Sequence, residues 1–246
     1  HNMSFSKIKS YAKINLALNI TGKTSSLHKI ESIVSFVNLF DDILIKRVKS
    51  NNHNVSFSGK FSKNIQKENT VTKLLNLLDK DELLKGKKFQ IKINKRIPNK
   101  AGLGGGSMNA ANILRYFVNK KIIVISKKKI KIISRLIGSD VILGLNSINS
   151  ILTSKNEIKY FTNCKKFFTL IVKPNYGCST KDIYLKVRKF NKPKLNRPKK
   201  KMFDLDYLKN MNNYLEPIVF SKFPKGRKIK LFLESSVGTK CKSARC

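Results

Sequence analysis

The spacing of apolar side chains predicts an alternation of strands and helices along the chain. Residues 11–20 place an apolar side chain at every second position towards their end, which predicts a strand with Lys13, Asn15 and Asn19 on its opposite face. Residues 89–93 alternate in the same way and predict a half-buried strand. A polar strand face usually meets solvent, so a solvated surface is the simplest interpretation of the three polar residues.

Helical spacing occurs in three segments. Asn69 or Thr70 is placed to cap an amphipathic helix, and Ser126 begins another helix that ends at Gly138. Apolar residues also recur at helical spacing within residues 110–118. Composition and periodicity predict further elements: strand-rich residues 30–46 with a turn at Asp41-Asp42, a polar hairpin over 51–62, a strand or hairpin over 151–161, a buried strand over 167–172, a turn and helix that begin within 174–180, a Pro- and Lys-rich loop over 191–201 and a helix over 203–214.

Four glycines within residues 102–106 lie between a predicted strand and a predicted helix, where Ser107 or Asn109 is placed to cap. A loop that feeds a helix N-terminus lets backbone N–H groups converge on an anion, aided by the helix dipole. The spacing fits neither a Walker loop nor a dinucleotide fingerprint. A flexible connection is the alternative, but each glycine costs chain entropy on ordering and a connector needs only one or two. The loop is therefore predicted to bind phosphate.

The net charge, taken by itself, favours a nucleic-acid or other anionic partner. The 246 residues include 52 Lys and Arg against 14 Asp and Glu, a formal net charge of +38. However, 44 of the basic residues are Lys spread through every segment, and the chain also holds 25 Asn. Lys and Asn enriched together are typical of an AT-rich genome. No specific nucleic-acid site is predicted, although the positive field would concentrate anionic substrates.

Composition also bounds the class of protein. A hydrophobic content of 41% is typical of a globular chain, and no apolar run reaches the roughly 18 residues that a membrane-spanning helix needs. The first residues lack the apolar segment of a secretory signal, and His1-Asn2 ahead of Met3 resembles an upstream extension of the start. The four cysteines show no pairing pattern, so a cytoplasmic location is expected.

The pattern Pro-x-x-x-Gly-Leu-Gly-Gly-Gly-Ser-x-Asn-Ala-Ala at residues 98–111 resembles the phosphate loop of the GHMP kinases. This superfamily includes galactokinase, homoserine kinase and mevalonate kinase. The triple glycine followed by Ser-x-Asn-Ala-Ala is most similar to one of its families, the 4-diphosphocytidyl-2-C-methyl-D-erythritol kinases of the non-mevalonate isoprenoid pathway. The resemblance covers residues 8 to 234 or so.

The resemblance implies an α+β protein with the GHMP kinase two-subdomain fold, a ribosomal-protein-S5-like N-terminal domain plus a ferredoxin-like C-terminal domain. Residues 1–153 would form the ATP-binding domain and residues 154–246 an incomplete C-terminal domain. The implied reaction is ATP-dependent phosphorylation of the 2-hydroxyl of 4-diphosphocytidyl-2-C-methyl-D-erythritol, with ATP and Mg²⁺ as cofactors. The expected partner is this small cytidine diphosphate substrate, without a specific nucleic acid or a membrane, and the expected state is a monomer or weak homodimer.

Two residues are implied to be catalytic. Ala-Lys-Ile-Asn-Leu at residues 12–16 is similar to the family's first motif, in which Lys13 would hold the acceptor hydroxyl and Asn15 would bind the substrate. Gly-x-Asp-Val at residues 138–141 is similar to its second motif, in which Asp140 would contact the attacking hydroxyl. Judged without the resemblance, a solitary acid at a helix boundary is more simply an N-cap.

The other implied site residues form two groups. ATP would contact Pro98, Ala101, Gly102, Leu103, Gly104, Gly105, Gly106, Ser107 and Asn109, and Ser107 would also touch Mg²⁺. The substrate would contact Asn15, His28, Thr180 and Tyr184. Ordinary packing or exposure is the alternative for His28 and Tyr184.

Three positions depart from the family's pattern. Leu27 replaces an aromatic residue beside the cytidine, Met108 replaces a second Ser, and Ile142 replaces a common Pro. Two other functions therefore stay open at this point: a GHMP kinase for another small alcohol, and a basic nucleic-acid-binding protein on the same fold.

The resemblance fails at the C-terminus. The family closes its active site with a third glycine-rich loop, a strand and a helix, whereas residues 235–246 hold one glycine and no apolar helix pattern. Cys241 and Cys246 lack the second ligand pair of a structural zinc site. A truncated or altered reading frame is expected, which would leave an open sheet edge and exposed apolar surface in the second domain and make it poorly stable.

Overall fold

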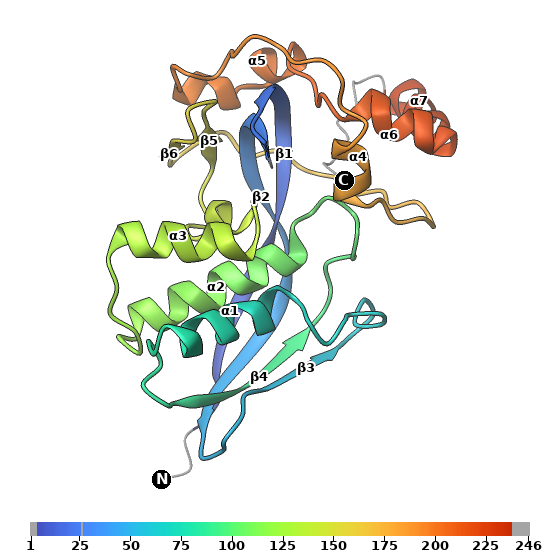
Figure 1. Cartoon of the computed structure of the whole chain (residues 1–246). Coiled ribbons are helices and arrows are strands. Elements are labelled where there is room, and N and C mark those ends of the chain that lie inside the picture. Colours follow the sequence, from blue (N-terminus) through green and yellow to red (C-terminus); the bar gives the residue numbers. More distant parts are fainter. Residues whose placement is uncertain (1–3, 26, 238–246) are drawn as a thin grey trace. The chain divides into compact units, whose positions relative to one another are not determined.

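Two long strands, β1 (Ser6–Lys23) and β2 (His28–Val48), begin the fold (Figure 1). They belong to a computed structural model of the chain that describes residues 4–25 and 27–237. Both strands contribute to each of two compact units. Of the described residues, unit 1 contains 4–13, 37–99 and 104–147, and unit 2 contains 14–25, 27–36, 100–103 and 148–237. The expected division of the chain between residues 153 and 154 stays a prediction.

The sheet of unit 1 is built on the second half of β2. Residues 42–48 of β2 pair antiparallel with β4 (Lys88–Asn94), and β3 (Asn54–Ser58) pairs parallel with β4. The inward side of β4 carries Phe89, Ile91 and Ile93, each at most 2% exposed, so the predicted alternation is confirmed. The polar hairpin predicted over residues 51–62 is replaced by this single strand β3 and its flanking turns.

The turn predicted at Asp41-Asp42 is wrong, because β2 runs through both residues without a break. Asp41 is fully buried, and its carboxylate accepts hydrogen bonds from two backbone N–H groups that follow β4. These partners hold Asp41 in an extended strand, although aspartate is a common turn residue in exposed loops.

Three helices cover the inward face of this sheet, side by side in Figure 1: α1 (Thr70–Lys80), α2 (Gly105–Asn119) and α3 (Lys127–Ile137). Asn69 caps α1 through a reciprocal box, in which its side chain accepts from the N–H of Thr72 and the Thr72 hydroxyl accepts from the N–H of Asn69. Ser126 caps α3 and Gly138 ends it, as predicted. The core between sheet and helices is lined by Ile43, Ile45, Leu74, Leu78, Phe89, Ile91, Ile93, Leu114 and Phe117.

The polar face of β1 is buried, so the solvated-surface interpretation is wrong. Lys13 is 1% exposed, Asn15 3% and Asn19 7%. Buried polar groups need partners, and burial of three of them on one strand therefore indicates that this face is built for specific contacts.

In unit 2, the first half of β2 pairs antiparallel with β5 (Ser150–Leu152) through residues 32–34. The strand β6 (Ile158–Tyr160) pairs antiparallel with β5, which confirms the predicted hairpin. Helical segments follow: α4 (Thr180–Tyr184), the 3₁₀ turn η2 (Lys200–Phe203), α5 (Leu205–Lys209), α6 (Glu216–Lys222) and α7 (Pro224–Val237). The helix predicted over residues 203–214 is therefore only five residues long.

The Pro- and Lys-rich segment before η2 is fixed by a buried carboxylate. Glu31 is fully buried on β2 and accepts hydrogen bonds from the N–H groups of Lys194 (2.7 Å) and Leu195 (3.0 Å). It also accepts one from the side-chain amide of Asn19 (2.8 Å). Residues 191–199 accordingly hold an ordered path without forming a helix or strand, which agrees with the predicted loop.

The buried strand predicted over residues 167–172 is wrong. This segment has no regular secondary structure, and Phe168 and Leu170 are 108% and 78% exposed. Within the described residues no strand pairs with it, and an apolar run cannot form a strand without a hydrogen-bonded neighbour.

Helix α7 reaches Val237, so it includes Ser235 and Ser236, the first residues of the segment that lacks an apolar helix pattern. The expectations about Cys241 and Cys246 concern residues that lie outside the described part of the chain. Among the helices of residues 4–25 and 27–237, none combines the length and apolar character that crossing a bilayer would require.

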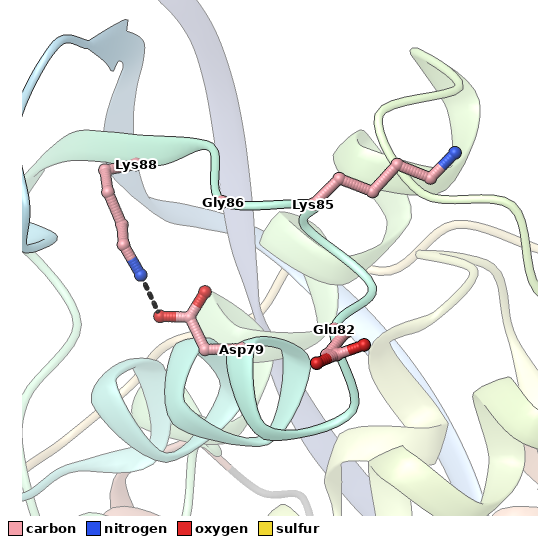
Figure 2. A pocket seen from close by; sticks show the side chains of 5 residues that line it. All are labelled: Asp79, Glu82, Lys85, Gly86 and Lys88. Carbon is pink, nitrogen blue, oxygen red and sulfur yellow. Dashed lines mark hydrogen bonds and ion pairs between the residues drawn. The ribbon is translucent and has the colours of Figure 1, made fainter.

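A charged cavity of about 420 Å³ lies beside the end of α1 (Figure 2). Its walls carry Asp79 and Lys88, which form an ion pair at 2.5 Å. His53 joins this pair: its Nε2 lies 3.1 Å from the Asp79 carboxylate, and its Nδ1 accepts a hydrogen bond from the N–H of Phe89. Nδ1 must therefore be unprotonated, so the imidazole is neutral and Nε2–H donates to Asp79.

We expect acidification to destabilise unit 1 through His53. Burial lowers the pKa of His53 below its ordinary value of 6.5, Lys88 adds to this effect and Asp79 opposes it. The unfolded chain then binds a proton that the folded chain refuses, so the free energy of unfolding should fall between about pH 7.5 and about pH 5.5. Chemical denaturation at both pH values tests this. His53→Gln should reduce the fall, and an unchanged pH dependence in that variant would contradict the role of His53.

Candidate active site

Helix α2 starts directly from the glycine loop. Gly104 precedes it in a left-handed conformation, with φ at +68°, and no side chain in the described part of the chain caps this end. Ser107 and Asn109 lie inside the helix, so the prediction that one of them caps it is wrong. Gly104 turns the backbone into the helix before either residue is reached. The N–H groups in the first turn of α2 therefore receive no capping hydrogen bond from a side chain of the described residues. Such uncapped N–H groups can bind an anion.

Lys13 lies against the backbone of this turn. A Cβ atom at Gly104 would lie 2.9 Å from both Cγ and Cε of Lys13, closer than real Cβ atoms approach. Glycine is therefore required here twice, for its positive φ and for the close passage of the lysine stem.

The stem leads to an ion pair. Lys13 Nζ lies 3.2 Å from Oδ2 of Asp140, and the two side chains are 1% and 14% exposed. The structure thus brings the two predicted catalytic residues together within unit 1. Pairing compensates the buried charge of Lys13, while the side chain of Asp140 keeps 14% of its surface exposed to solvent.

Asp140 occupies the N-cap position of the 3₁₀ turn η1 (Val141–Gly144), as the N-cap interpretation expected. In the described structure its side chain makes no capping hydrogen bond to that turn. The carboxylate pairs with Lys13 instead, so capping does not account for this acid.

Ser107 and Met108 lie on different sides of the first turn of α2. A Cβ atom at Gly138 would lie 3.7 Å from the Ser107 hydroxyl, so Ser107 faces the segment that leads to Asp140. Met108 is fully buried, and a Cβ atom at Gly144 would lie 2.6 Å from its sulfur. The methionine thus fills a core position that Gly144 leaves open, and it offers no oxygen to a phosphate or a metal.

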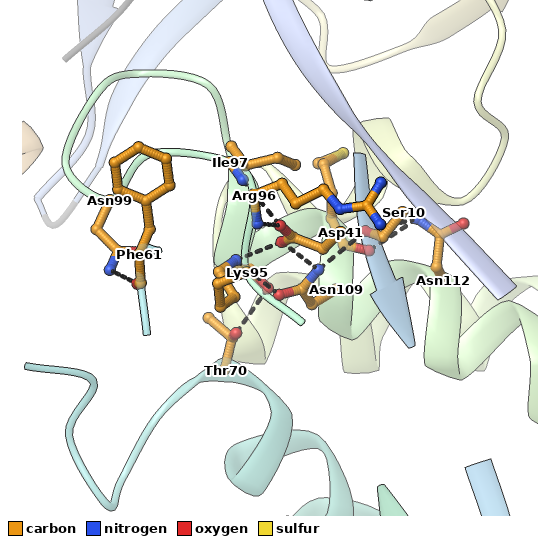
Figure 3. A network of polar contacts seen from close by, with 12 residues as sticks. Ser10, Asp41, Phe61, Thr70, Lys95, Arg96, Ile97, Asn99, Asn109 and Asn112 are labelled. Atoms are coloured by element: carbon orange, nitrogen blue, oxygen red, sulfur yellow. Dashed lines mark hydrogen bonds and ion pairs between the residues drawn. The ribbon is translucent and has the colours of Figure 1, made fainter. Parts of the chain in front are cut away.

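A second buried lysine lies below the loop (Figure 3). Lys95 is 2% exposed, and its ammonium group donates to the carboxylate of Asp41 and to the side-chain oxygen of Asn109 (3.0 Å). A Cβ atom at Gly105 would lie 3.2 Å from this ammonium. Lys13 and Lys95 are the buried lysines of the described residues, and each lies against a glycine of the loop.

Sequence reasoning missed both Asp41 and Lys95. Lys95 looked like one of 44 dispersed lysines, but it continues the alternation of Phe89, Ile91 and Ile93, which was a usable signal that it faces the core. Burial lowers the pKa of Lys95, and the neighbouring Asp41 carboxylate opposes this shift. Asn109, predicted to bind ATP, is 1% exposed and its side chain lies in this network, so its side chain acts from beneath the loop.

The first half of the loop belongs to unit 2. The carbonyl of Lys100 accepts a hydrogen bond from the N–H of Cys178 (3.1 Å), and a Cβ atom at Gly177 would lie 3.1 Å from Cβ of Lys100. Gly102 has a positive φ of 70°, and Leu103 is buried. Of the other two predicted loop residues, Ala101 is half-buried in unit 2 and Pro98 is half-buried in unit 1.

Unit 2 also holds the four residues expected to contact the substrate. The Asn15 amide donates to the Ser32 hydroxyl (2.8 Å), which in turn donates to the carbonyl of Ala17 (2.6 Å). The orientation of Asn15 on β1 is thus fixed by its neighbour strand.

His28 and Tyr184 are brought together, with ring centroids 5.0 Å apart. Thr180 begins α4, the short helix that Tyr184 ends. A third ring, that of Phe190, has its centroid 6.4 Å from that of His28 and is 46% exposed. Phe190 was not among the residues predicted to contact the substrate. Burial, with a further effect of Lys23, lowers the pKa of His28, which favours a neutral imidazole at neutral pH.

Comparison with known proteins identifies the family of this chain. Residues 69–150 match the family model of the GHMP kinases N terminal domain. The chain is 54% identical over 237 residues to the 4-diphosphocytidyl-2-C-methyl-D-erythritol kinase of Pelagibacter ubique, which covers 96% of this chain and 84% of that protein. This chain belongs to the 4-diphosphocytidyl-2-C-methyl-D-erythritol kinase family.

A second member of this kinase family, from Clostridium perfringens, is 36% identical over 228 residues, which cover 88% of this chain and 77% of that protein. The crystal structure of a 4-(cytidine 5'-diphospho)-2C-methyl-D-erythritol kinase superposes with a TM-score of 0.71 at 22% identity and covers 98% of this chain and 88% of that chain. The α+β class and the GHMP kinase fold are therefore confirmed. Against the family's pattern, Leu27 is 65% exposed beside His28 and supplies no ring there.

We expect Gly104→Ala to abolish most kinase turnover, by a factor of about a hundred or more, because the new methyl group displaces Lys13. The measurement is the initial rate of ATP consumption in the presence of the family's substrate. Gly86→Ala is the matched control: Gly86 also has a positive φ, at +73°, but nothing lies within 4 Å of its Cβ position.

Both substitutions carry a backbone strain of about 1–2 kcal/mol. Gly104→Ala must also move the buried stem of Lys13, so it should lower thermal stability more than Gly86→Ala does. Only Gly104→Ala should lose turnover. Full activity in a folded Gly104→Ala protein would show that the contact with Lys13 is not needed.

Proposed function

We propose that this kinase transfers the γ-phosphoryl group of ATP to the 2-hydroxyl of 4-diphosphocytidyl-2-C-methyl-D-erythritol. The observation that carries the proposal is the Lys13–Asp140 ion pair, 3.2 Å apart, with Lys13 pressed against Gly104 of the loop. The choice of acceptor is supported by the relatives, among them the 4-diphosphocytidyl-2-C-methyl-D-erythritol kinase of Pelagibacter ubique at 54% identity.

The N-terminal turn of α2 is proposed to hold the phosphates. Its N–H groups start at Gly105, behind a left-handed Gly104, and the positive end of the helix dipole favours an anion there. Gly105 and Gly106 carry no side chains, so oxygen atoms could approach the backbone closely. The hydroxyl of Thr70 donates a hydrogen bond to the backbone carbonyl of Gly106 (2.6 Å), which holds that peptide group in place.

Asp140 is proposed to accept a hydrogen bond from the attacking hydroxyl. An alcohol is a much weaker acid than a carboxylic acid, so the carboxylate orients the nucleophile more than it deprotonates it. Lys13 would hold Asp140 in place and offset negative charge on the transferring phosphoryl group. In a loose phosphoryl-transfer transition state, positioning and electrostatic stabilisation supply most of the rate enhancement.

Mg²⁺ fits the donor chemistry of this site. The described residues contain no group of three His, Cys, Asp or Glu that could hold a metal by themselves. Mg²⁺ commonly takes only one or two protein oxygens and completes its shell with phosphate oxygens and water. The Ser107 hydroxyl and the Asp140 carboxylate are the oxygens that would serve, and a bound Mg²⁺ would neutralise charge on the phosphates.

The cytidyl end of the substrate is assigned to Asn15, His28, Thr180 and Tyr184. The closely spaced rings of His28 and Tyr184 support this assignment, because aromatic faces stack on nucleobases. The enzyme is proposed to act in the cytoplasm as a monomer or weak homodimer. The free thiols of Cys164 and Cys178 agree with a reducing compartment.

We expect ATP consumption that depends on the cytidyl substrate. The test measures ADP release with 4-diphosphocytidyl-2-C-methyl-D-erythritol, homoserine, mevalonate and galactose as separate acceptors, followed by identification of the phosphorylated carbon. Turnover with the cytidyl substrate and a 2-phosphate product would support the proposal. Turnover with another acceptor but none with the cytidyl substrate would contradict it, whereas weak duplex binding at low salt follows from the net charge and decides nothing.

Lys13→Ala and Asp140→Ala should each reduce turnover by a factor of about a hundred or more, the usual scale for a positioned acid–base or charge-stabilising group. ATP binding should be largely kept in Asp140→Ala, since the α2 backbone is intact. Lys88→Ala is the matched control, because Lys88 forms the 2.5 Å pair with Asp79 outside the loop. Near-normal turnover in either active-site variant would remove that residue's assigned role.

A further inference from the structure

Asp41 is a fully buried acid below the glycine loop, and each hydrogen bond of its carboxylate goes to a residue that flanks that loop. It is 0% exposed on β2, inside unit 1. Its two carboxylate oxygens divide their partners between residues that precede the loop and a residue of the helix that follows it (Figure 3).

The first oxygen holds the start of the loop. Oδ1 accepts hydrogen bonds from the N–H groups of Arg96 (2.7 Å) and Ile97 (2.9 Å). These are the last residues before Pro98, where the glycine loop begins. Two consecutive N–H groups on one carboxylate oxygen fix the direction in which the chain leaves β4.

The second oxygen holds the end of the loop. Oδ2 accepts hydrogen bonds from the Lys95 ammonium and from the side-chain amide of Asn109 (3.0 Å). Lys95 also donates to the Asn109 oxygen (3.0 Å), so the amide of Asn109 is held from both sides. Asn109 lies in the opening turns of α2, and the Lys95 ammonium is 3.2 Å from the Cβ position of Gly105.

We propose that Asp41 is a positioning residue of the nucleotide site, which fixes the distance between the two ends of the phosphate loop. The inference rests on the proposed function. Convergent N–H groups bind an anion strongly only when their spacing is set before the anion arrives. One carboxylate that fastens both ends of a glycine-rich loop provides that spacing, since the glycines themselves impose little.

Stability alone does not explain this buried pair. Removing two charges from water costs free energy, and their attraction offsets this cost only when the geometry is excellent. Apolar residues of the same volume often stabilise a core as well or better. The carboxylate of Asp41 receives four hydrogen bonds, two from the chain before the loop, one from α2 and one from Lys95. The arrangement therefore secures a specific backbone geometry, for which apolar residues have no equivalent.

The experiment compares ATP affinity and steady-state kinetics between the wild-type chain and Asp41→Asn. The dissociation constant for ATP is measured by calorimetry without the second substrate. It should rise on the order of tenfold or more, because the start of α2 is no longer fastened to the start of the loop. The KM for ATP should rise with it, while the KM for the cytidyl substrate stays within about twofold, a split that general loss of structure would not produce.

Two further variants keep the test decisive. Asp41→Asn leaves Lys95 buried without its counter-charge, so the double variant Asp41→Asn/Lys95→Met removes both charges and is expected to fold. Glu31→Gln is the matched control, because Glu31 is equally buried and accepts two consecutive N–H groups and an amide, but from Lys194, Leu195 and Asn19. It should lower thermal stability without changing ATP affinity.

The outcomes separate this inference from the proposed function. If the wild-type chain binds ATP and a folded Asp41 variant, single or double, binds it within about twofold as tightly, the positioning role is overturned and the proposed function stands. An equal loss of ATP affinity in Glu31→Gln would also overturn the role. A wild-type chain that does not bind ATP at all would overturn the proposed function, and this inference with it.

Discussion

The site depends on the close passage of Lys13 beneath Gly104. The lysine stem occupies the volume that a side chain at position 104 would need, and its ammonium then meets Asp140 at 3.2 Å. A single steric constraint thereby couples three segments that are far apart in the sequence: β1, the start of α2 and the turn before η1. Only glycine satisfies this geometry, because the site leaves no room for a Cβ atom and requires a positive φ.

Buried charge is used sparingly in a chain that is otherwise covered with lysine. Of its 44 Lys, the described structure buries Lys13 and Lys95, and each has a carboxylate partner, Asp140 and Asp41. Both pairs lie against the glycine loop. Burial of an ammonium group costs free energy unless the group is paired and hydrogen-bonded. Apolar side chains would often stabilise the same volume better, so two buried pairs in one place indicate that the positions of the surrounding groups are under constraint. Every other lysine of the described residues keeps some exposure to solvent.

Most local elements of unit 1 were predictable, because each is determined by neighbours in sequence. Asn69 and Ser126 cap helices, and the alternation from Phe89 to Ile93 forms β4, since capping and strand alternation need only a few residues. The predictions failed where a distant partner decides. Asp41 stays in a strand because N–H groups 55 residues away hold it, and residues 167–172 form no strand because no described neighbour pairs with them.

The amino-acid sequence by itself determined the phosphate loop and the family, because a glycine-rich turn before a helix and its flanking motifs are local patterns with a local physical reason. It also supplied Lys13 and Asp140 as candidates, but only through resemblance. The tertiary structure decided that these two side chains meet, that neither Ser107 nor Asn109 caps α2, and that Asp41 fastens the loop from below. Each of those facts depends on contacts between distant segments, and periodicity carries no information about which distant segments will touch.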